Sequence, residues 1–144
     1  MVLAKMSVAE LEKFLHDEFP QAFRGGDISI ESADGESCLL RQRYSDQMLR
    51  PGGTVSGPTL MALADFAMYV VLLSAIGPIG LAVTTNLNIN FLRMGHPGQD
   101  VLAAQAHGDE RSKPSDHQTF GVDQHPLLRH VGRLCRKRFH VRNP

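Results

Sequence analysis

The sequence has no net charge, only two cysteines and no leader-like N-terminus, and each absence narrows what the protein can be. Cys38 and Cys135 lie far apart and match no metal-ligand spacing, so we expect two free thiols in a reducing cytoplasm. The balanced charge provides no overall attraction for nucleic acid or for an anionic membrane. The first residues lack the basic start and apolar run of a signal peptide. We therefore expect a soluble cytoplasmic protein with no nucleic-acid or membrane partner.

The chain is long and apolar enough for one domain, with 144 residues of which 42% are hydrophobic. Its charges are unevenly distributed. Residues 1–104 carry seven Lys and Arg against eleven Asp and Glu, whereas residues 105–144 carry eight against four, with five of the seven histidines. This contrast divides the chain into a domain over 1–104 and an atypical basic tail over 105–144, rich in His and Arg.

The first third of the chain predicts a helix and a hairpin. Ser7 is followed three residues later by Glu10, which is the spacing of a capping box, and the helix that it opens ends before the first proline. Apolar and polar residues alternate over 28–31 and predict a strand. The Asp-Gly pair at 34–35 is a strong hairpin signal, and it leads into a second strand over 37–44.

A long apolar segment over residues 59–75 is the most distinctive feature, because Asp65 is its only charge. A helix that is apolar on every side is either buried in a domain or spans a membrane. A span needs about 20 predominantly apolar residues without a carboxylate midway. Since Gly77 and Pro78 end the segment early, we predict a buried central helix.

A regular alternation follows the helix. Apolar and polar residues alternate over 83–91 and predict a strand with one packed face and one polar face, and a further strand starts at residues 100–104. The simplest architecture that buries the helix on all sides is a curved antiparallel sheet wrapped around it. The fold class predicted is therefore α+β.

Periodicity disappears from residue 105 onward. The tail is open to three interpretations: a basic segment that binds a polyanion, a metal site made of its histidines, whose spacings match no ligand motif, or an ordinary disordered or loosely attached tail. A fourth hypothesis is out-of-frame translation, because the alternation stops abruptly although the sheet needs at least one more strand to close. One back-translation of residues 138–144, read one base along, yields a strand-like Ser-Thr-Tyr-Ala string. Coding DNA without strand-like sequence in its other frames would exclude this hypothesis.

A glycine turn runs directly into the apolar helix and suggests chemistry on a carbonyl group. The first N–H groups of a helix have no internal partner, and the helix dipole makes that end positive. The N–H of Gly57 can therefore stabilise the oxyanion that forms when a thioester is attacked. Asp65 lies two turns further on, and a buried carboxylate there is costly unless it is hydrogen-bonded or used, and is a stronger base. The alternative is that Asp65 caps a loop or pairs with a basic residue across an interface.

Residues 50–100 resemble the PaaI-like thioesterase group of the hotdog superfamily. The family pattern is an Asn, a glycine, then His-Gly-Gly and a helix with an acid nine residues after the His. In this sequence Gly53 stands at the first glycine, Ser56 at the His, Gly57 and Pro58 at the next two positions, and Asp65 at the acid. The resemblance is strong in the middle third of the chain, loose in the first third and absent from the tail.

This resemblance implies an acyl-CoA thioesterase without metal or redox cofactor. Asp65 would act as general base on water or as nucleophile, the N–H of Gly57 would hold the carbonyl oxygen, and Thr84 would help to position the nucleophile. Arg93 is a candidate for the CoA phosphates, because a guanidinium suits phosphate geometry, although a solvated strand-end charge is as good an interpretation. Proteins of this group are dimers or tetramers with sites shared between subunits, so Gly57 would face Asp65 of a second copy.

Two departures from the family pattern keep an alternative open. Arg50 replaces the Asn that orients the attacking group, and Ser56 replaces the His near the thioester. Arg50 could instead pair with Asp65 across the interface, and Ser56 could cap the helix. The alternative function is a non-catalytic hotdog protein that binds an acyl thioester or serves as a scaffold. A hotdog dehydratase or hydratase is disfavoured, because no His lies near the apolar helix.

Overall fold

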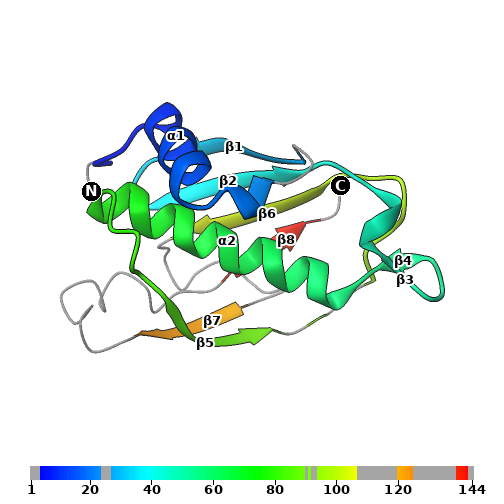
Figure 1. Cartoon of the computed structure of the whole chain (residues 1–144). Coiled ribbons are helices and arrows are strands. Elements are labelled where there is room, and N and C mark those ends of the chain that lie inside the picture. The colour runs from blue at the N-terminus through cyan, green and yellow to red at the C-terminus, as the bar shows by residue number, and fades with distance from the viewer. Residues whose placement is uncertain are drawn as a thin grey trace.

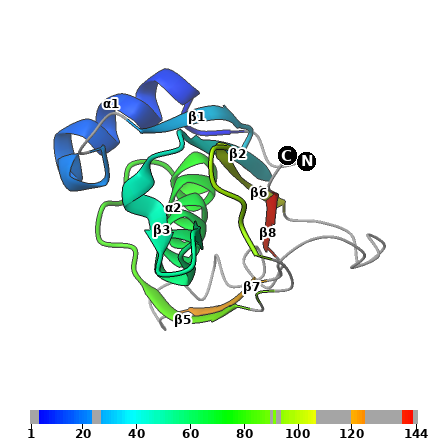
Figure 2. The same ribbon diagram turned by 90° about the vertical axis from the view of Figure 1, so that its right-hand side faces the viewer.

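A single long helix lies in the concave side of a curved antiparallel sheet (Figures 1 and 2). The structure is a computed structural model, and it describes residues 4–23, 27–89, 91, 94–106, 120–124 and 139–142. The elements in chain order are α1 (Val8–Glu18), η1 (Pro20–Phe23), β1 (Ile28–Ala33), β2 (Ser37–Gln42), η2 (Asp46–Met48), β3 (Leu49–Arg50), β4 (Thr54–Val55), α2 (Gly57–Ile76), β5 (Thr84–Ile89), β6 (Val101–Ala106), β7 (Phe120–Gln124) and β8 (Phe139–Arg142). This is the α+β hotdog architecture that the sequence predicts.

The sheet is built from antiparallel pairs. The described strands form a four-stranded sheet with the order β1-β2-β6-β8 and two two-stranded sheets, in which β5 pairs with β7 and β3 pairs with β4. Figure 2 shows α2 nearly end-on, with the four-stranded sheet on one side and β5 and β7 on another. The β1–β2 turn is the predicted one: Gly35 has a positive φ of 85°, and the Asp34 carboxylate accepts hydrogen bonds from the N–H groups of Glu36 and Ser37 at 2.9 and 2.6 Å.

The predicted N-terminal helix is also confirmed. The Ser7 hydroxyl accepts the N–H of Glu10 at 3.3 Å, and the Glu10 carboxylate accepts the N–H of Ser7 at 2.8 Å, which completes the capping box. The helix lies beside β1 and α2 and buries Leu11 and Leu15 completely. It thereby covers one edge of the sheet.

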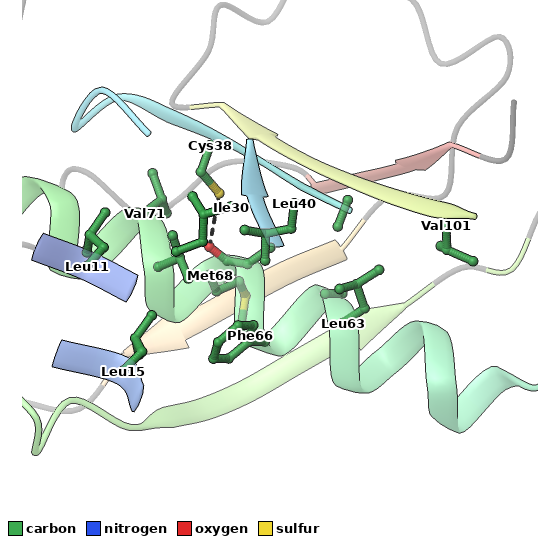
Figure 3. Packing of buried hydrophobic residues seen from close by; sticks show 14 of the residues in the cluster. Leu11, Leu15, Ile30, Cys38, Leu40, Leu63, Phe66, Met68, Val71 and Val101 are labelled. Atoms are coloured by element: carbon green, nitrogen blue, oxygen red, sulfur yellow. Dashed lines mark hydrogen bonds between the residues drawn. The ribbon is translucent and has the colours of Figure 1, made fainter. Parts of the chain in front are cut away.

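Helix α2 supplies more of the core than any other described element (Figure 3). Its second half is buried almost throughout, and its side chains contact Leu40 of β2 and Val101 of β6 within one apolar cluster. By length and composition α2 could also cross a membrane, but 67% of its most apolar window is buried inside the fold, as expected of a core helix. The Cys38 thiol donates to the carbonyl of Ala67 at 3.2 Å, and burial raises its pKa to about 12, so this cysteine is a free, unreactive thiol.

The first half of α2 differs from the prediction of a helix that is buried on all sides. The helix is not enclosed on all sides, because four of its side chains are exposed. They are Pro58, Met61, Ala62 and Asp65. Their spacing of three or four residues places them on one face. The fold therefore buries most of the second half of α2 but leaves one face of the first half open.

Two strands in the tail were not predicted. Strand β8 pairs with β6, and β7 pairs with β5, so parts of the tail extend the sheets of the domain. These stretches have four and five residues, too few for an alternation to stand out from the sequence. Four of the five tail histidines lie outside the described residues. The two short strands do not test the hypothesis of out-of-frame translation, which stays a proposal.

Acid stability should depend on Asp100, which ties the end of β2 to the start of β6. Its carboxylate accepts the N–H of Tyr44 at 2.8 Å and an N–H of Arg41 at 3.3 Å, and these bonds lower its pKa. A lowered pKa in the folded state stabilises the fold above the usual carboxyl value of about 3.9, and this contribution is lost as pH falls below it. We expect Asp100→Asn to flatten the acid limb of a Tm-versus-pH curve. Glu12→Gln, which replaces a half-buried carboxylate of α1, is the control, and an unchanged acid limb in Asp100→Asn would contradict the assignment.

Candidate active site

The start of α2 is a well-formed helix cap. The Ser56 hydroxyl accepts the N–H of Thr59 at 3.3 Å and shares a 2.8 Å hydrogen bond with the Thr59 hydroxyl. The predicted capping role of Ser56 is therefore confirmed. Gly57 is the first helical residue, and the N–H of a first helical residue has no carbonyl partner within its helix. This N–H carries the positive end of the helix dipole.

The ring of Phe91 lies against Gly57. A Cβ added to Gly57 would come within 3.3 Å of Phe91 Cζ, while the Phe91 side chain is 48% exposed. The contact involves the far end of an exposed ring, which can shift by a few tenths of an ångström. Gly57 therefore allows a close approach to the helix start without being strictly required by packing.

Asp65 is exposed in the single chain, where burial had been expected. It lies on the open face of α2, together with Pro58, Met61 and Ala62. Eight residues separate it from Gly57, which corresponds to about 12 Å along the helix axis. One thioester group cannot be contacted at both positions of the same helix. If both groups act on one carbonyl, they must come from two copies of the chain.

An open groove of about 1320 Å³ runs along this face of α2. Asp65 lies midway along it. Toward the start of α2 its lining includes several uncharged polar side chains beside Met48 and Pro58, whereas toward the end of α2 aromatic and apolar side chains are numerous beside Glu18 and Gln21. The polar end includes Gln42, Ser45, Gln47 and Thr59, and the apolar end includes Phe14, Phe19, Phe66, Tyr69, Leu81 and Val83. The groove thus presents Asp65 between a more polar and a more apolar half, with Glu18 and Asp27 also in its lining.

Aromatic packing shapes the apolar half. The ring of Phe66 meets that of Phe19 edge-on at 6.1 Å and that of Phe23 at 5.5 Å between centroids. The hydroxyl of Tyr69 donates to the carbonyl of Gly80 at 3.1 Å. Partial burial, and then the negative charge of Glu18, raise the pKa of Tyr69, so this hydroxyl stays protonated and able to donate.

The remaining predicted residues are distributed around the helix start. Pro58 is exposed and lines the groove. Arg50, in β3, donates through Nε to the Thr54 hydroxyl at 2.9 Å and so supports the β3–β4 turn. Thr84 begins β5, which contacts α2, but its side chain lies outside what the structure describes. Arg93 lies outside the described residues altogether.

The sequence analysis missed the groove itself. Its walls come from α1, η1, the loop before β3 and the loop after α2, which only the tertiary fold brings together. One part of the groove could have been predicted from the sequence, because Asp65 and Tyr69 are four residues apart and therefore share a face of the helix. Within the described residues, no group of three or more His, Cys, Asp and Glu side chains has the geometry to hold a metal ion.

The comparisons with known proteins agree with the fold. The thioesterase superfamily profile matches residues 52–106, from the turn before α2 to the end of β6. The middle part of the chain is thus similar to the thioesterase superfamily, and this similarity supports thioesterase activity in general. Solved structures that share the fold of the chain include PaaI, whose group the sequence resembles.

Three solved structures illustrate the similarity. A candidate thioesterase from Silicibacter sp. TM1040 is 26% identical, with 97% of this chain and 91% of that chain covered and a TM-score of 0.66. Zebrafish thioesterase superfamily member 2 is 14% identical, with 96% and 99% covered and a TM-score of 0.61. The PaaI protein of E. coli is 20% identical, with 94% and 93% covered and a TM-score of 0.54. The last two show a common fold only. No curated protein sequence matches this chain significantly.

Proposed function

We propose that this protein hydrolyses acyl-CoA thioesters to a free acid and CoA, with Asp65 as the catalytic carboxylate. The observation that carries the proposal is the position of Asp65: it is the one charged side chain of α2, and it is exposed inside a groove with a polar and an apolar half. Once a substrate or a second copy covers this face, a carboxylate there is costly unless it is hydrogen-bonded or used. The polar half suits the thioester and its pantetheine arm, and the apolar half suits the acyl group.

In the proposed reaction, Asp65 removes a proton from water while the water oxygen attacks the thioester carbon. The carbonyl oxygen becomes an oxyanion, which the N–H of Gly57 stabilises. The intermediate then expels the CoA thiolate, which takes up a proton. In a second route Asp65 itself attacks the thioester carbon, the C–S bond breaks and CoA leaves as the thiolate, and water then hydrolyses the resulting mixed anhydride to the free acid and restores Asp65. Neither route needs a metal or redox cofactor. Thr84 is proposed to position the nucleophile, and Arg93 to contact the CoA phosphates.

The distance along α2 supports a site shared between two copies. If two α2 helices lie antiparallel with their open faces in contact, Gly57 of one copy comes close to Asp65 of the other. Met61 and Ala62 would then lie at the crossing point, where the exposed apolar side chain and the small side chain favour close packing. A homodimer, alone or within a tetramer, is the proposed assembly, and Arg50 is proposed to reach Asp65 of the second copy.

The second candidate is a non-catalytic protein that binds acyl thioesters. Two observations favour it: the Ser56 hydroxyl is engaged in the helix cap, and Arg50 is bonded to Thr54 in its own chain. Release of free thiol from CoA esters ranging from acetyl to palmitoyl distinguishes the two functions. Turnover of any of them supports the hydrolase, whereas saturable binding without thiol release supports the alternative.

A pair of substitutions at residue 57 tests the oxyanion donor. Proline is tolerated at the first position of a helix but has no N–H, so Gly57→Pro removes the donor and keeps the helix start. We expect kcat to fall by about 10²–10³-fold, the usual cost of losing one such donor.

Gly57→Ala is the matched control. It keeps the N–H and asks only that the exposed Phe91 ring shift slightly, so it should retain most of the activity. Circular dichroism and thermal melts should show that both variants fold. An equal loss of kcat in the two variants would argue against a donor role for this N–H.

A further inference from the structure

Tyr69 lines the apolar half of the groove. This residue lies four positions after Asp65, on the same face of α2 and about 6 Å further along the axis. Its hydroxyl donates to the carbonyl of Gly80 at 3.1 Å, in the loop that follows α2. Both residues line the groove. The tyrosine ring and the loop are thus joined at the point where the groove leaves the helix.

The loop after α2 is held in place from several sides. Gly77 donates its N–H to the carbonyl of Leu73 at 2.8 Å, and Ala82 donates to the carbonyl of Ile79 at 3.3 Å. A Cβ added to Gly80 would be 3.5 Å from Phe14 Cζ and 4.0 Å from the Tyr69 hydroxyl oxygen, so α1 and α2 both contact it. A wall built in this way resists displacement by a ligand.

The apolar half of the groove lies between Asp65 and this wall. Leu81 and Val83 line it and are 92% and 60% exposed, so a hydrocarbon placed there would cover surface that otherwise faces water. The polar half extends in the opposite direction, toward the start of α2. An acyl group attached to a thioester at Asp65 would therefore extend toward Tyr69, which lies about one helical turn further along α2.

We propose that Tyr69, anchored to Gly80, is a specificity-determining residue that limits the substrates of this enzyme to short acyl chains. This inference rests on the proposed thioesterase function and adds the substrate class. A long acyl chain would have to displace the ring, break its bond to Gly80 and move a loop that packs against Phe14. A short chain fits between the carboxylate and the wall without these changes.

The test is the dependence of kcat/KM on acyl length in three variants. Tyr69→Ala removes the wall and should shift the preference toward longer chains, because each methylene that gains a buried place adds roughly fourfold. We expect the ratio of decanoyl-CoA to butyryl-CoA turnover to rise by at least about tenfold. Tyr69→Trp has a larger ring and should shift the preference toward shorter chains. Tyr44→Ala, which removes a tyrosine that does not line the groove, should keep the parental profile.

Two outcomes separate the possible failures. If the parent protein hydrolyses no acyl-CoA of any length, the proposed function fails and this inference fails with it. If the parent is active and depends on Asp65, but Tyr69→Ala and Tyr69→Trp both keep its chain-length profile, then only the role of Tyr69 is wrong. Because Trp replaces an aromatic ring on a partly exposed position, it keeps the test decisive even if the alanine variant unfolds.

Discussion

Replacing Asp65 by Asn is expected to lower kcat/KM for acyl-CoA hydrolysis by about 10²–10⁴-fold, the range attributed to a positioned general base. The amide has nearly the shape of the carboxylate but cannot accept a proton from water or attack the thioester as an anion. Because Asp65 is exposed in the single chain, the substitution should leave the fold and its Tm nearly unchanged. Free-thiol release with the best acyl-CoA substrate measures the effect.

Asp27→Asn is the matched control, since Asp27 is another carboxylate that lines the groove but lies before β1 rather than on α2. It should retain most of the activity. Substrate binding in Asp65→Asn should also persist, because the walls of the groove are unchanged. Equal activity in Asp65→Asn and the parent would remove this residue from the mechanism. Equal losses in both variants would point to a general charge effect of the groove.

Mixing two inactive variants is expected to restore activity. If each site combines Gly57 of one copy with Asp65 of the other, a mixed dimer of Gly57→Pro and Asp65→Asn has one site with both changes and one site with neither. Such a dimer should have about half the activity of the parent dimer, although each variant alone is nearly inactive. The reason is geometric, because about 12 Å of helix separates the two positions within one chain.

The experiment requires subunit exchange, which native mass spectrometry of differently tagged variants can establish. The two variants are mixed, the doubly tagged species is isolated, and thiol release is measured against each variant alone. Mixed dimers that form but stay inactive would show that both groups act within one chain. Mixtures of Asp65→Asn with the parent serve as the control, since they contain intact sites in proportion to the parent subunit.

The tail also bears on whether a second copy of the chain can bind at the edge of the sheet. Strands β7 and β8 lie within residues 105–144 and add to both sheets, so the described part of the tail contributes to the fold. The proposal of out-of-frame translation concerns the same residues, and only the coding DNA decides it. Were other strands encoded there, the sheet edge available to a second copy would change as well.

Local patterns in the sequence were enough to predict most elements near the site. The Ser7 capping box, the turn at Asp34 and Gly35 and the long apolar helix all appear where short-range rules place them, because caps, tight turns and core helices depend on neighbouring residues. Asp65 stood out for the same reason, as the one charge in an apolar run. The exposure of Asp65 could not be predicted, because a helix that is apolar on nearly every side has no polar stripe to show which face lies open.

By itself, therefore, the sequence determined that a hotdog domain forms around one helix, that a glycine begins this helix and that a single acid interrupts it. Only the tertiary structure decided that this acid faces a groove and that Tyr69 meets Gly80 at its end. The physical reason is the separation along the sequence over which each kind of interaction acts. Propensities and caps act over a few residues, whereas the groove is formed by α1, the loop after α2 and α2 itself, which meet only when the sheet has folded around the helix.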